Sequence, residues 1–466
     1  MNDKTEKPRA TVGFFEFLTK RDLHFQSELT KSVAQSVTRR AALQKFGLGL
    51  AGMALACFGL ANMAQAQFTY ETNNGTITIT GYTGSGSNVT IPSSTNGYLV
   101  TTIGDYAFYL SSLTNAMIPN SVTKIGDFAF GDSGLRSVTI GNSVTTLGSH
   151  AFFSCISLTS VMIPASVTIL GDNAFAFCYS LTNTVIPNSV IAIGNNAFDS
   201  CSGLTSLTIG NSVTTIGDWA FAACYGLTNI VIPNSVITIG DHAFDSCYGL
   251  TSMTIGNSVI AIGAGAFYLS GLTSLTIPNS VTTIGDNAFT SCYSLTSVAF
   301  GNSVATIGHD AFNSCSMLPN IVIPNSVTNL GNSAFASCSA LTNAFFQGNA
   351  PGVDGVAGSV DRSVFAGAIG KVYYVPGTTG WGSTFGGWPA VPILPRVGGN
   401  IGIHSGNFGF TITGATNQTV VVEACADLAH PVWLPIATNT LANGSSVFSD
   451  AKWTNHPSRF YRLRSP

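Results

Sequence analysis

Residues 232–254 read IPNSVITIGDHAFDSCYGLTSMT, and residues 277–299 read IPNSVTTIGDNAFTSCYSLTSVA. This block of about 23 residues recurs in tandem copies through residues 118–345, and a looser copy ending in TTIGDYAFYLSSLTNAM precedes them. A tandem repeat of this length is typical of a solenoid, in which each unit buries its apolar face against its neighbours. The sequence therefore predicts a β-rich solenoid of about eleven coils.

Three residue types recur once in every copy and separate the core from the surface. In one copy they are Gly240, Phe244 and Leu250, and equivalent residues follow at the same spacing along the repeats. Equivalent side chains of stacked coils lie above one another, so the phenylalanine column predicts an aromatic spine through the stack. Burial of each such ring stabilises the fold by roughly 1.5–3 kcal/mol.

Each coil is expected to contain one short strand and one short helical turn. Residues 204–209, LTSLTI, alternate apolar and polar side chains, as a half-buried strand does. The recurring glycine is followed in most copies by Asp, Asn or Ser, as at Asp218, and these types cap helix starts. A column of aspartates also suggests calcium binding, but Ser149 and Ala264 interrupt it, which favours capping.

The pattern S-V-T-x-I-G-x-x-A-F-x-x-C-x-x-L-x-x-I-x-I-P, found between Ser235 and Ile255 and beyond, resembles the BspA-type leucine-rich repeat of bacterial surface proteins. The resemblance covers residues 89–345. It implies a leucine-rich repeat solenoid, a secreted or surface-anchored protein, and a role in adhesion and protein recognition.

The first 66 residues are similar to an export signal. Arg39 and Arg40 precede an apolar run, and Ala64 and Ala66 form a small-x-small cleavage site that places the mature start at Gln67. The arginine pair resembles a twin-arginine signal, and an ordinary secretory signal is the alternative. The apolar run is short for a membrane-spanning helix, so we expect no span in the mature chain and a periplasmic, surface or secreted location.

The remaining sequence divides into four parts. We expect an N-terminal cap and first repeat in residues 67–117, the regular solenoid in 118–345, an irregular terminal coil in 346–398, and a small β-sandwich-like domain in 399–466. Exposed ends of a solenoid need caps, which accounts for the strand-rich TITITGY near the start and the Gly-, Pro- and aromatic-rich stretch after residue 345.

Charge and motif content exclude several classes of function. From Gln67 onward the chain has 9 basic and 16 acidic residues, and between residues 89 and 345 the basic residues are Lys124 and Arg136. Nucleic-acid binding requires clustered basic residues and is excluded. The G-x-G-x-x-G string at 47–52 lies in the apolar run of the signal and is a chance match. The histidines lack ligand spacing, so we expect no metal. Local motifs assemble no Ser/His/Asp set, paired carboxylates or phosphate loop, so we expect no catalytic site and no cofactor.

Eight cysteines occupy one column of the repeat: 155, 178, 201, 224, 247, 292, 315 and 338. Adjacent coils stack about 4.8 Å apart with parallel side chains, which is a poor geometry for disulfides. Ser133, Leu110 and Leu269 lie near the corresponding position in other copies. We therefore expect buried, reduced thiols that fill space, and we expect Cys425 to be a buried strand residue.

The candidate recognition surface is the exposed side of the predicted strands, expected to be the inner face of the solenoid. Its side chains are neutral and rich in hydroxyl groups, and the residues selected are Ser206, Thr208, Asn229, Ser252, Thr254, Ser274 and Thr276. Asn and Ser copies alternate in part, which suggests duplication of a pair of coils. Two interpretations remain open: a face that binds a protein or glycan at a cell surface, and a merely solvated face of a structural spacer.

Overall fold

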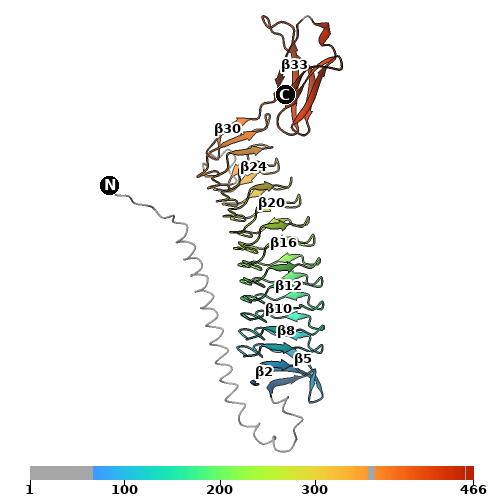
Figure 1. The fold of residues 1–466 in the computed structure, drawn as a ribbon, viewed down its shortest axis with the longest axis vertical. Helices are drawn as coiled ribbons and strands as arrows, with labels where there is room; N and C mark the ends of the chain where they lie inside the picture. The colour runs from blue at the N-terminus through green and yellow to red at the C-terminus, as the bar shows by residue number, and fades with distance from the viewer. Residues whose placement is uncertain (1–66, 355–362, 457) are drawn as a thin grey trace, which may run out of the picture. The chain divides into compact units, whose positions relative to one another are not determined.

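The computed structural model describes residues 67–354, 363–456 and 458–466, and the chain from Gln67 to Pro466 forms one compact unit. Most of this unit is a succession of stacked coils made of short strands and turns, and the coils contribute to two series of strands (Figure 1). The solenoid and the strand-rich C-terminal region expected from the sequence are confirmed.

The first sheet has 15 strands and is continuous along the repeats. Along the repeats the strands pair in parallel, beginning with β2 and β5 and continuing with β5 and β7. Two short antiparallel pairings lie at the N-terminal end, β1 with β2 and β4 with β5. Its strands are β1 (Phe68–Asn73), β2 (Thr76–Tyr82), β4 (Ser94–Thr95), β5 (Tyr98–Ile103), β7 (Lys124–Ile125), β9 (Thr146–Leu147), β11 (Ile169–Leu170), β13 (Ala192–Ile193), β15 (Thr215–Ile216), β17 (Thr238–Ile239), β19 (Ala261–Ile262), β21 (Thr283–Ile284), β23 (Thr306–Ile307), β25 (Asn329–Leu330) and β27 (Gly352–Val353).

The second series of strands forms what we call the strand face, and its hydrogen bonding is divided into several sheets. Its strands are β3 (Asn88–Thr90), β6 (Asn115–Met117), β8 (Ser137–Thr139), β10 (Ser160–Val161), β12 (Asn183–Val185), β14 (Ser206–Thr208), β16 (Asn229–Val231), β18 (Ser252–Thr254), β20 (Ser274–Thr276), β22 (Ser297–Ala299), β24 (Asn320–Ile323), β26 (Asn343–Phe346), β28 (Lys371–Tyr374), β29 (Thr384–Phe385) and β30 (Trp388–Pro392). Parallel coils therefore continue past residue 345, where the regular repeat ends.

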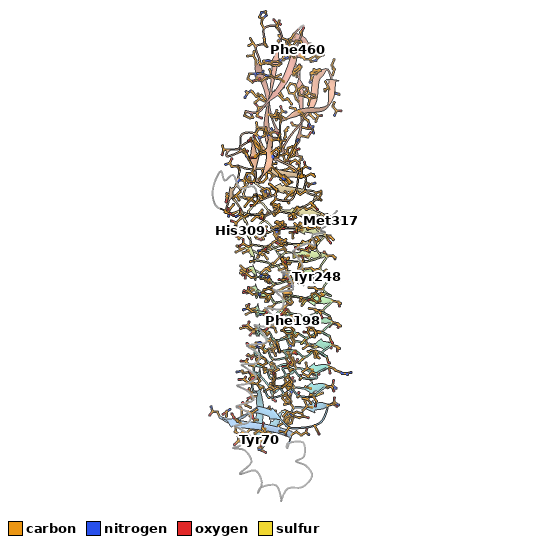
Figure 2. The ribbon with its side chains drawn as sticks, turned by 90° about the vertical axis from the view of Figure 1, so that its left-hand side faces the viewer. Tyr70, Phe198, Tyr248, His309, Met317 and Phe460 are labelled. Carbon is orange, nitrogen blue, oxygen red and sulfur yellow. The ribbon has the colours of Figure 1, made fainter. Side chains whose placement is uncertain are left out.

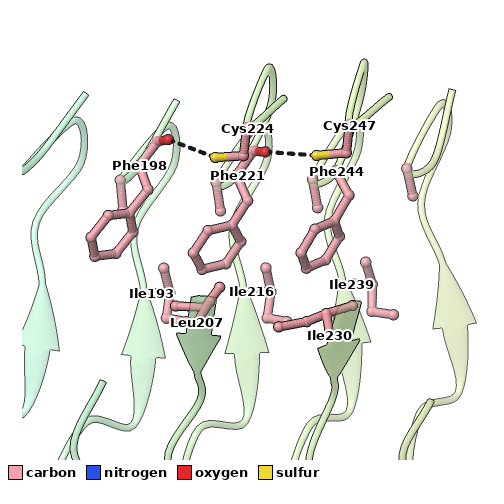
Figure 3. Close-up of a cluster of buried hydrophobic side chains, with 14 of the residues drawn as sticks. Ile193, Phe198, Leu207, Ile216, Phe221, Cys224, Ile230, Ile239, Phe244 and Cys247 are labelled. Carbon is pink, nitrogen blue, oxygen red and sulfur yellow. Dashed lines mark hydrogen bonds between the residues drawn. The ribbon is translucent and has the colours of Figure 1, made fainter. Parts of the chain in front are cut away.

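The phenylalanine column forms the predicted spine. Successive rings from Phe108 to Phe335 are stacked, as in Phe198–Phe221 at 5.4 Å and Phe221–Phe244 at 5.2 Å between centroids, and all of them are buried (Figure 3). Tyr82 lies against Phe108 at one end of the spine. At the other end Phe365 stacks on Trp388, with centroids 4.3 Å apart, so aromatic side chains outside the regular repeat close both ends.

The expected helical turn is wrong. Between the recurring glycine and the cysteine, the chain makes successive turns in which every fourth residue, such as Trp219 (φ 59°) and Ala223 (φ 53°), is left-handed. The N–H of Trp219 donates to Asp241 O of the next coil at 2.8 Å, whereas that of Ala220 donates to Gly217 O within the coil. A single helical turn leaves its first N–H groups without internal partners, whereas here alternate N–H groups donate to the next coil, so the turns also link the coils.

The aspartate column is a ladder between coils and not a set of helix caps. The N–H of Asp241 donates to Oδ1 of Asp218 at 2.8 Å, and Asp218 N–H donates to Oδ1 of Asn195 in the same way. The glycine before each of these residues is required, because a Cβ at Gly240 would lie 2.6 Å from Asp218 Oδ1. His309 occupies the same position and accepts from the N–H of Asn332 through Nδ1.

Two kinds of hydrogen bond join consecutive coils at the second turn. Asn211 N–H donates to Asn188 Oδ1 at 2.8 Å, and Asn257 N–H donates likewise to Asn234. At the intervening step, the Ser235 hydroxyl donates to Val213 O at 2.7 Å. The alternation is partial, because the equivalent hydroxyl of Ser280 has no hydrogen-bond partner among the described residues.

The C-terminal region is made of two antiparallel three-stranded sheets, β31-β32-β35 and β34-β33-β36. Their bounds are β31 (Arg396–His404), β32 (Asn407–Thr413), β33 (Gln418–Cys425), β34 (Leu434–Leu441), β35 (Ser445–Asp450) and β36 (Phe460–Arg464), and the short 3₁₀ helix η3 spans Trp453–Asn455. This module has its own apolar core, which contains Phe410, Val422 and Phe448. Cys425 is buried at the end of β33, as expected.

Candidate functional site: the strand face and its tyrosine border

The structure places all seven candidate residues on exposed positions of four consecutive strands, β14, β16, β18 and β20. In each strand the first and third side chains are exposed while the second points into the core, as Ile230 does. This follows from the alternation of side chains along a strand. The face also exposes apolar side chains in the third position, including Met162 and Val231, which are 82% and 63% exposed.

The candidates are brought together in pairs and not in one continuous ladder. Asn229 lies opposite Ser252 in the paired strands β16 and β18. Ser206 and Thr208 end a six-stranded sheet at β14, and Ser274 and Thr276 begin the next pair at β20. The strand face is therefore organised in two-coil units along this part of the solenoid.

The threonines that directly precede the strands, such as Thr205 and Thr251, form hydrogen bonds between coils. Thr205 donates through Oγ1 to Thr182 O at 3.0 Å, and Thr251 donates to Thr228 O at 3.3 Å. The seven candidate residues differ from these threonines in their hydrogen bonding. Within the described part of the chain, one side-chain hydrogen bond is found for them: Asn229 Nδ2 donates to Thr228 Oγ1 at 3.4 Å. The candidate hydroxyls are thus directed to the exterior, where a ligand can use them.

A second surface column was missed in reading the sequence. Four tyrosines, Tyr179, Tyr225, Tyr248 and Tyr293, directly follow the column cysteine, and we call them the tyrosine ridge. They are 47–54% exposed, and Tyr225 and Tyr248 stack with centroids 5.5 Å apart. Each tyrosine lies four residues before the first exposed position of the strand face, so the ridge borders that face. The recurring Cys-Tyr pair was the available signal.

The ridge and the strand face carry no charged side chain from Ile156 to Phe345. The acidic ladder runs along a different edge of the coil: Figure 2 shows His309, a member of that column, and Met317, beside the strand face, on opposite sides of the stack. The candidate surface therefore combines phenol rings, hydroxyls, carboxamides and aliphatic groups in an uncharged strip.

The cysteine column lies inside and offers no chemistry at the surface. The column thiols are free and buried, and each donates to a phenylalanine carbonyl of the preceding coil, as Cys224 does to Phe198 O at 3.4 Å (Figure 3). Burial raises the pKa of Cys224 well above its ordinary value, which disfavours the reactive thiolate. Ser133 and Ser270 lie beside the column thiols of Cys155 and Cys292 and so occupy the column in their own coils, and Leu269 directly precedes Ser270.

Two histidines of the repeats, His150 and His242, are partly buried. His150 stacks on Phe128 at 4.2 Å, and burial lowers its pKa to about 4, although Asp172 opposes the shift. His242 stacks on Trp219 at 4.0 Å and contacts the buried Asp245 through Nδ1 at 2.8 Å. They lie in the left-handed position of the turn, where the ring of the preceding coil covers them.

The buried carboxylate of Asp245 resembles part of a hydrolytic site, but its partners are arranged differently. His242 Nδ1 contacts Oδ2 of this carboxylate, and the Ser246 hydroxyl donates to Oδ1. Activation of a serine requires a histidine placed on the serine itself. The cluster is therefore best understood as a satisfied polar group in the turn. Among the described residues there is also no group of three or more metal-ligating side chains.

The expected export residues Arg39, Arg40, Ala64 and Ala66 lie outside the described residues. The described part of the chain contains no helix that is long and apolar enough to cross a membrane.

Comparison with known proteins identifies the repeat. No curated protein matches the chain. A leucine-rich repeat protein from Bacteroides ovatus is 25% identical, with coverage of 68% of this chain and 94% of that protein and a TM-score of 0.47. A leucine-rich cell surface protein from Faecalibacterium prausnitzii is 27% identical, with coverage of 66% and 93% and a TM-score of 0.39.

The family model described as the BspA-type leucine-rich repeat region matches residues 101–228 and 216–342, which together make up more than half of the chain. These matches contain the phenylalanine spine, the aspartate ladder and the four strands of the candidate surface. The chain therefore belongs to the BspA-type leucine-rich repeat family.

Proposed function

We propose that this protein is an exported, non-catalytic adhesion or recognition module that binds a macromolecule of a cell surface through the strand face. The observation that carries the proposal is the set of seven exposed, uncharged side chains on β14, β16, β18 and β20, whose hydroxyls point outward from a rigid stack. A repeated, rigid surface suits recognition because little conformational entropy is lost on binding.

The test uses the chain from Gln67 to Pro466 as bait in a surface extract, beside a variant with Thr208, Thr254 and Thr276 changed to Lys. All three threonines are exposed, so the lysines are expected to leave the fold intact while adding charge to the face. Loss of the wild-type partners from the variant supports recognition by the strand face. Identical partners, or none with either protein, would instead support the alternative of a structural spacer.

Export is a separate part of the proposal, supported by the Arg39-Arg40 pair, the apolar run and Ala64-Gln65-Ala66. Mass spectrometry of protein recovered from outside the cytoplasm should find Gln67 at the N-terminus, and full-length protein confined to the cytoplasm would contradict the proposal. Changing both arginines to lysine should block export by the twin-arginine route and should have little effect on an ordinary secretory route.

A further inference from the structure

We propose that the tyrosine ridge and the adjoining strand face together bind a neutral polysaccharide chain that lies along the stack of coils. This inference rests on the proposed function, because it names the class of macromolecule that the strand face recognises.

The first argument is the exposed aromatic surface beside hydroxyl and amide groups. Tyr248, labelled in Figure 2, and Tyr293 are 47% and 54% exposed. Tyr248 stacks with Tyr225. A pyranose ring has an apolar face that stacks on an aromatic ring and a rim of hydroxyls that form hydrogen bonds. Ligand sites combine apolar rings with a few polar groups in this manner. Here Ser252 and Thr254 supply the polar groups four and six residues after Tyr248.

The coil between Tyr248 and Tyr293 differs from its neighbours. Gly271 follows the column residue Ser270 there, so this coil presents no side chain at the ridge position between the two tyrosines. Tyr268 of the same coil is partly buried.

The second argument is electrostatic. The ridge and strand face lack charged side chains from Ile156 to Phe345, while the acidic residues of the ladder occupy another edge. An anionic polymer or a charged protein surface would lose hydration here without gaining an opposite charge. A neutral polysaccharide carries no charge whose hydration would be lost on binding. Its hydroxyls can exchange hydrogen bonds to water for hydrogen bonds to Ser, Thr and Asn side chains.

The third argument is periodicity, and it favours a polysaccharide over a protein. Coils recur at the strand spacing of about 4.8 Å, so equivalent positions of the strand face recur at that spacing. Each coil presents a hydroxyl or carboxamide at the first exposed position, as Asn229, Ser252 and Ser274 do. A polymer of identical sugars meets similar groups at each step, so weak contacts add along the chain. The surface of a globular protein has no such repeat.

The experiment measures binding of the chain from Gln67 to Pro466 to soluble neutral polysaccharides by affinity electrophoresis and calorimetry. The probes are a β-1,3-glucan, hydroxyethyl cellulose and an α-mannan, and polygalacturonate is the anionic control. The variants are Y248S/Y293S, Y248F/Y293F and, as a matched control, Y98S, which changes a tyrosine of similar exposure (45%) in β5. Circular dichroism and melting curves verify that each variant is folded.

We expect at least one neutral polysaccharide to bind with little dependence on salt, since no charge is involved. The Ser double variant should weaken binding about tenfold for each ring, because a stacked aromatic contact is worth up to 1.5 kcal/mol. The Phe variant and Y98S should bind nearly as the wild type does. The inference is overturned by binding to polygalacturonate alone, by absence of binding to all neutral probes, or by unchanged binding of Y248S/Y293S.

The outcome also separates this inference from the proposed function. If the neutral probes fail but the strand-face lysine variant still loses protein partners from a surface extract, the ligand is a protein, and the recognition function stands without the glycan. If both experiments are negative, the spacer interpretation replaces both proposals.

Discussion

Asp218 accepts a hydrogen bond from the backbone N–H of Asp241 in the next coil, 2.8 Å from its Oδ1, while its own N–H donates to Asn195. Asp218 is thus the acceptor for one neighbouring coil and the donor to the other, and the ladder is interrupted at Ala264, which donates to Asp241 but has no side-chain acceptor. The Asp218 carboxylate lies so close to Gly240 that a Cβ at Gly240 would clash with Oδ1, so the hydrogen bond requires a glycine at that position. The ladder couples coils at the edge of the stack, outside the apolar core.

Asp218→Ala should remove the acceptor for the Asp241 N–H and cost about 1 kcal/mol, the usual net value of one hydrogen bond. Native-state hydrogen exchange should then accelerate at the amide of Asp241. Asp218→Asn is the matched control, because Asn195 performs the same task in the native chain and should preserve slow exchange. Equal exchange in the Ala and Asn variants would show that the ladder contributes nothing.

Phe221→Ala tests the spine on which the solenoid depends. The buried ring stacks on Phe198 and Phe244, and comparable truncations cost roughly 3–5 kcal/mol. Because coils couple to their nearest neighbours, hydrogen exchange should rise first in the adjacent coils and only later at the ends. Thr208→Ser, an exposed change nearby, should leave exchange and melting almost unaltered. Unaltered melting of Phe221→Ala would be incompatible with a Phe core.

His150 should make the first coils sensitive to mild acid. Its pKa is lowered to about 4 by burial, below the ordinary value of 6.5, so protonation favours the unfolded state. The stability that the neutral ring provides is complete above pH 6.5 and is lost as the pH falls toward 4, with a limiting loss of about 3 kcal/mol. Urea midpoints at pH 7 and pH 5 measure the effect.

His150→Asn provides the comparison, because Asn173 and Asn196 occupy the equivalent left-handed position in other coils. The variant should lose the part of the pH dependence between pH 6.5 and 4 and otherwise fold normally. A pH profile identical to that of the wild type would assign the dependence to other groups.

Glu423 should govern the acid stability of the C-terminal module. Hydrogen bonds from Arg464 (2.9 Å) and Arg462 (2.7 Å) lower the pKa of this carboxyl. A lowered pKa in the folded state means that the stabilisation is present above the ordinary value of about 4.3 and is lost as the pH falls through the lower, folded value. Melting of the module should therefore be constant near neutral pH and decline in acid.

Glu423→Gln should lower the melting temperature of the module by several degrees at pH 7 and should match the wild type in strong acid, where both side chains are neutral. Calorimetry of the chain from Gln67 to Pro466 can follow this transition. A difference between the two proteins that is constant over the whole pH range would mean that packing, and not the charge of Glu423, is responsible.

Much of the architecture was predictable because every coil has apolar residues at the same positions, and each coil must bury them in the same way. Phe221 and Leu227 recur at one spacing, and only stacking of equivalent positions buries all of their copies. The exposed positions of Ser206 and Thr208 followed from simple alternation along a strand. The aspartate column was misassigned for a physical reason: a carboxylate after a glycine accepts an N–H at a helix start or from a neighbouring chain, and the sequence is the same in both cases.

Thus the amino-acid sequence by itself determined the repeat, the buried columns, the exposed strand residues and the absence of charge along them, since these depend on spacing and side-chain chemistry. The tertiary structure alone decided that Asp218 serves the next coil, that Phe365 and Trp388 extend the spine, and that Tyr225 stacks on Tyr248. Those relationships join residues about one coil apart, and they exist only after stacking has brought distant backbone segments within hydrogen-bonding and ring-contact distance.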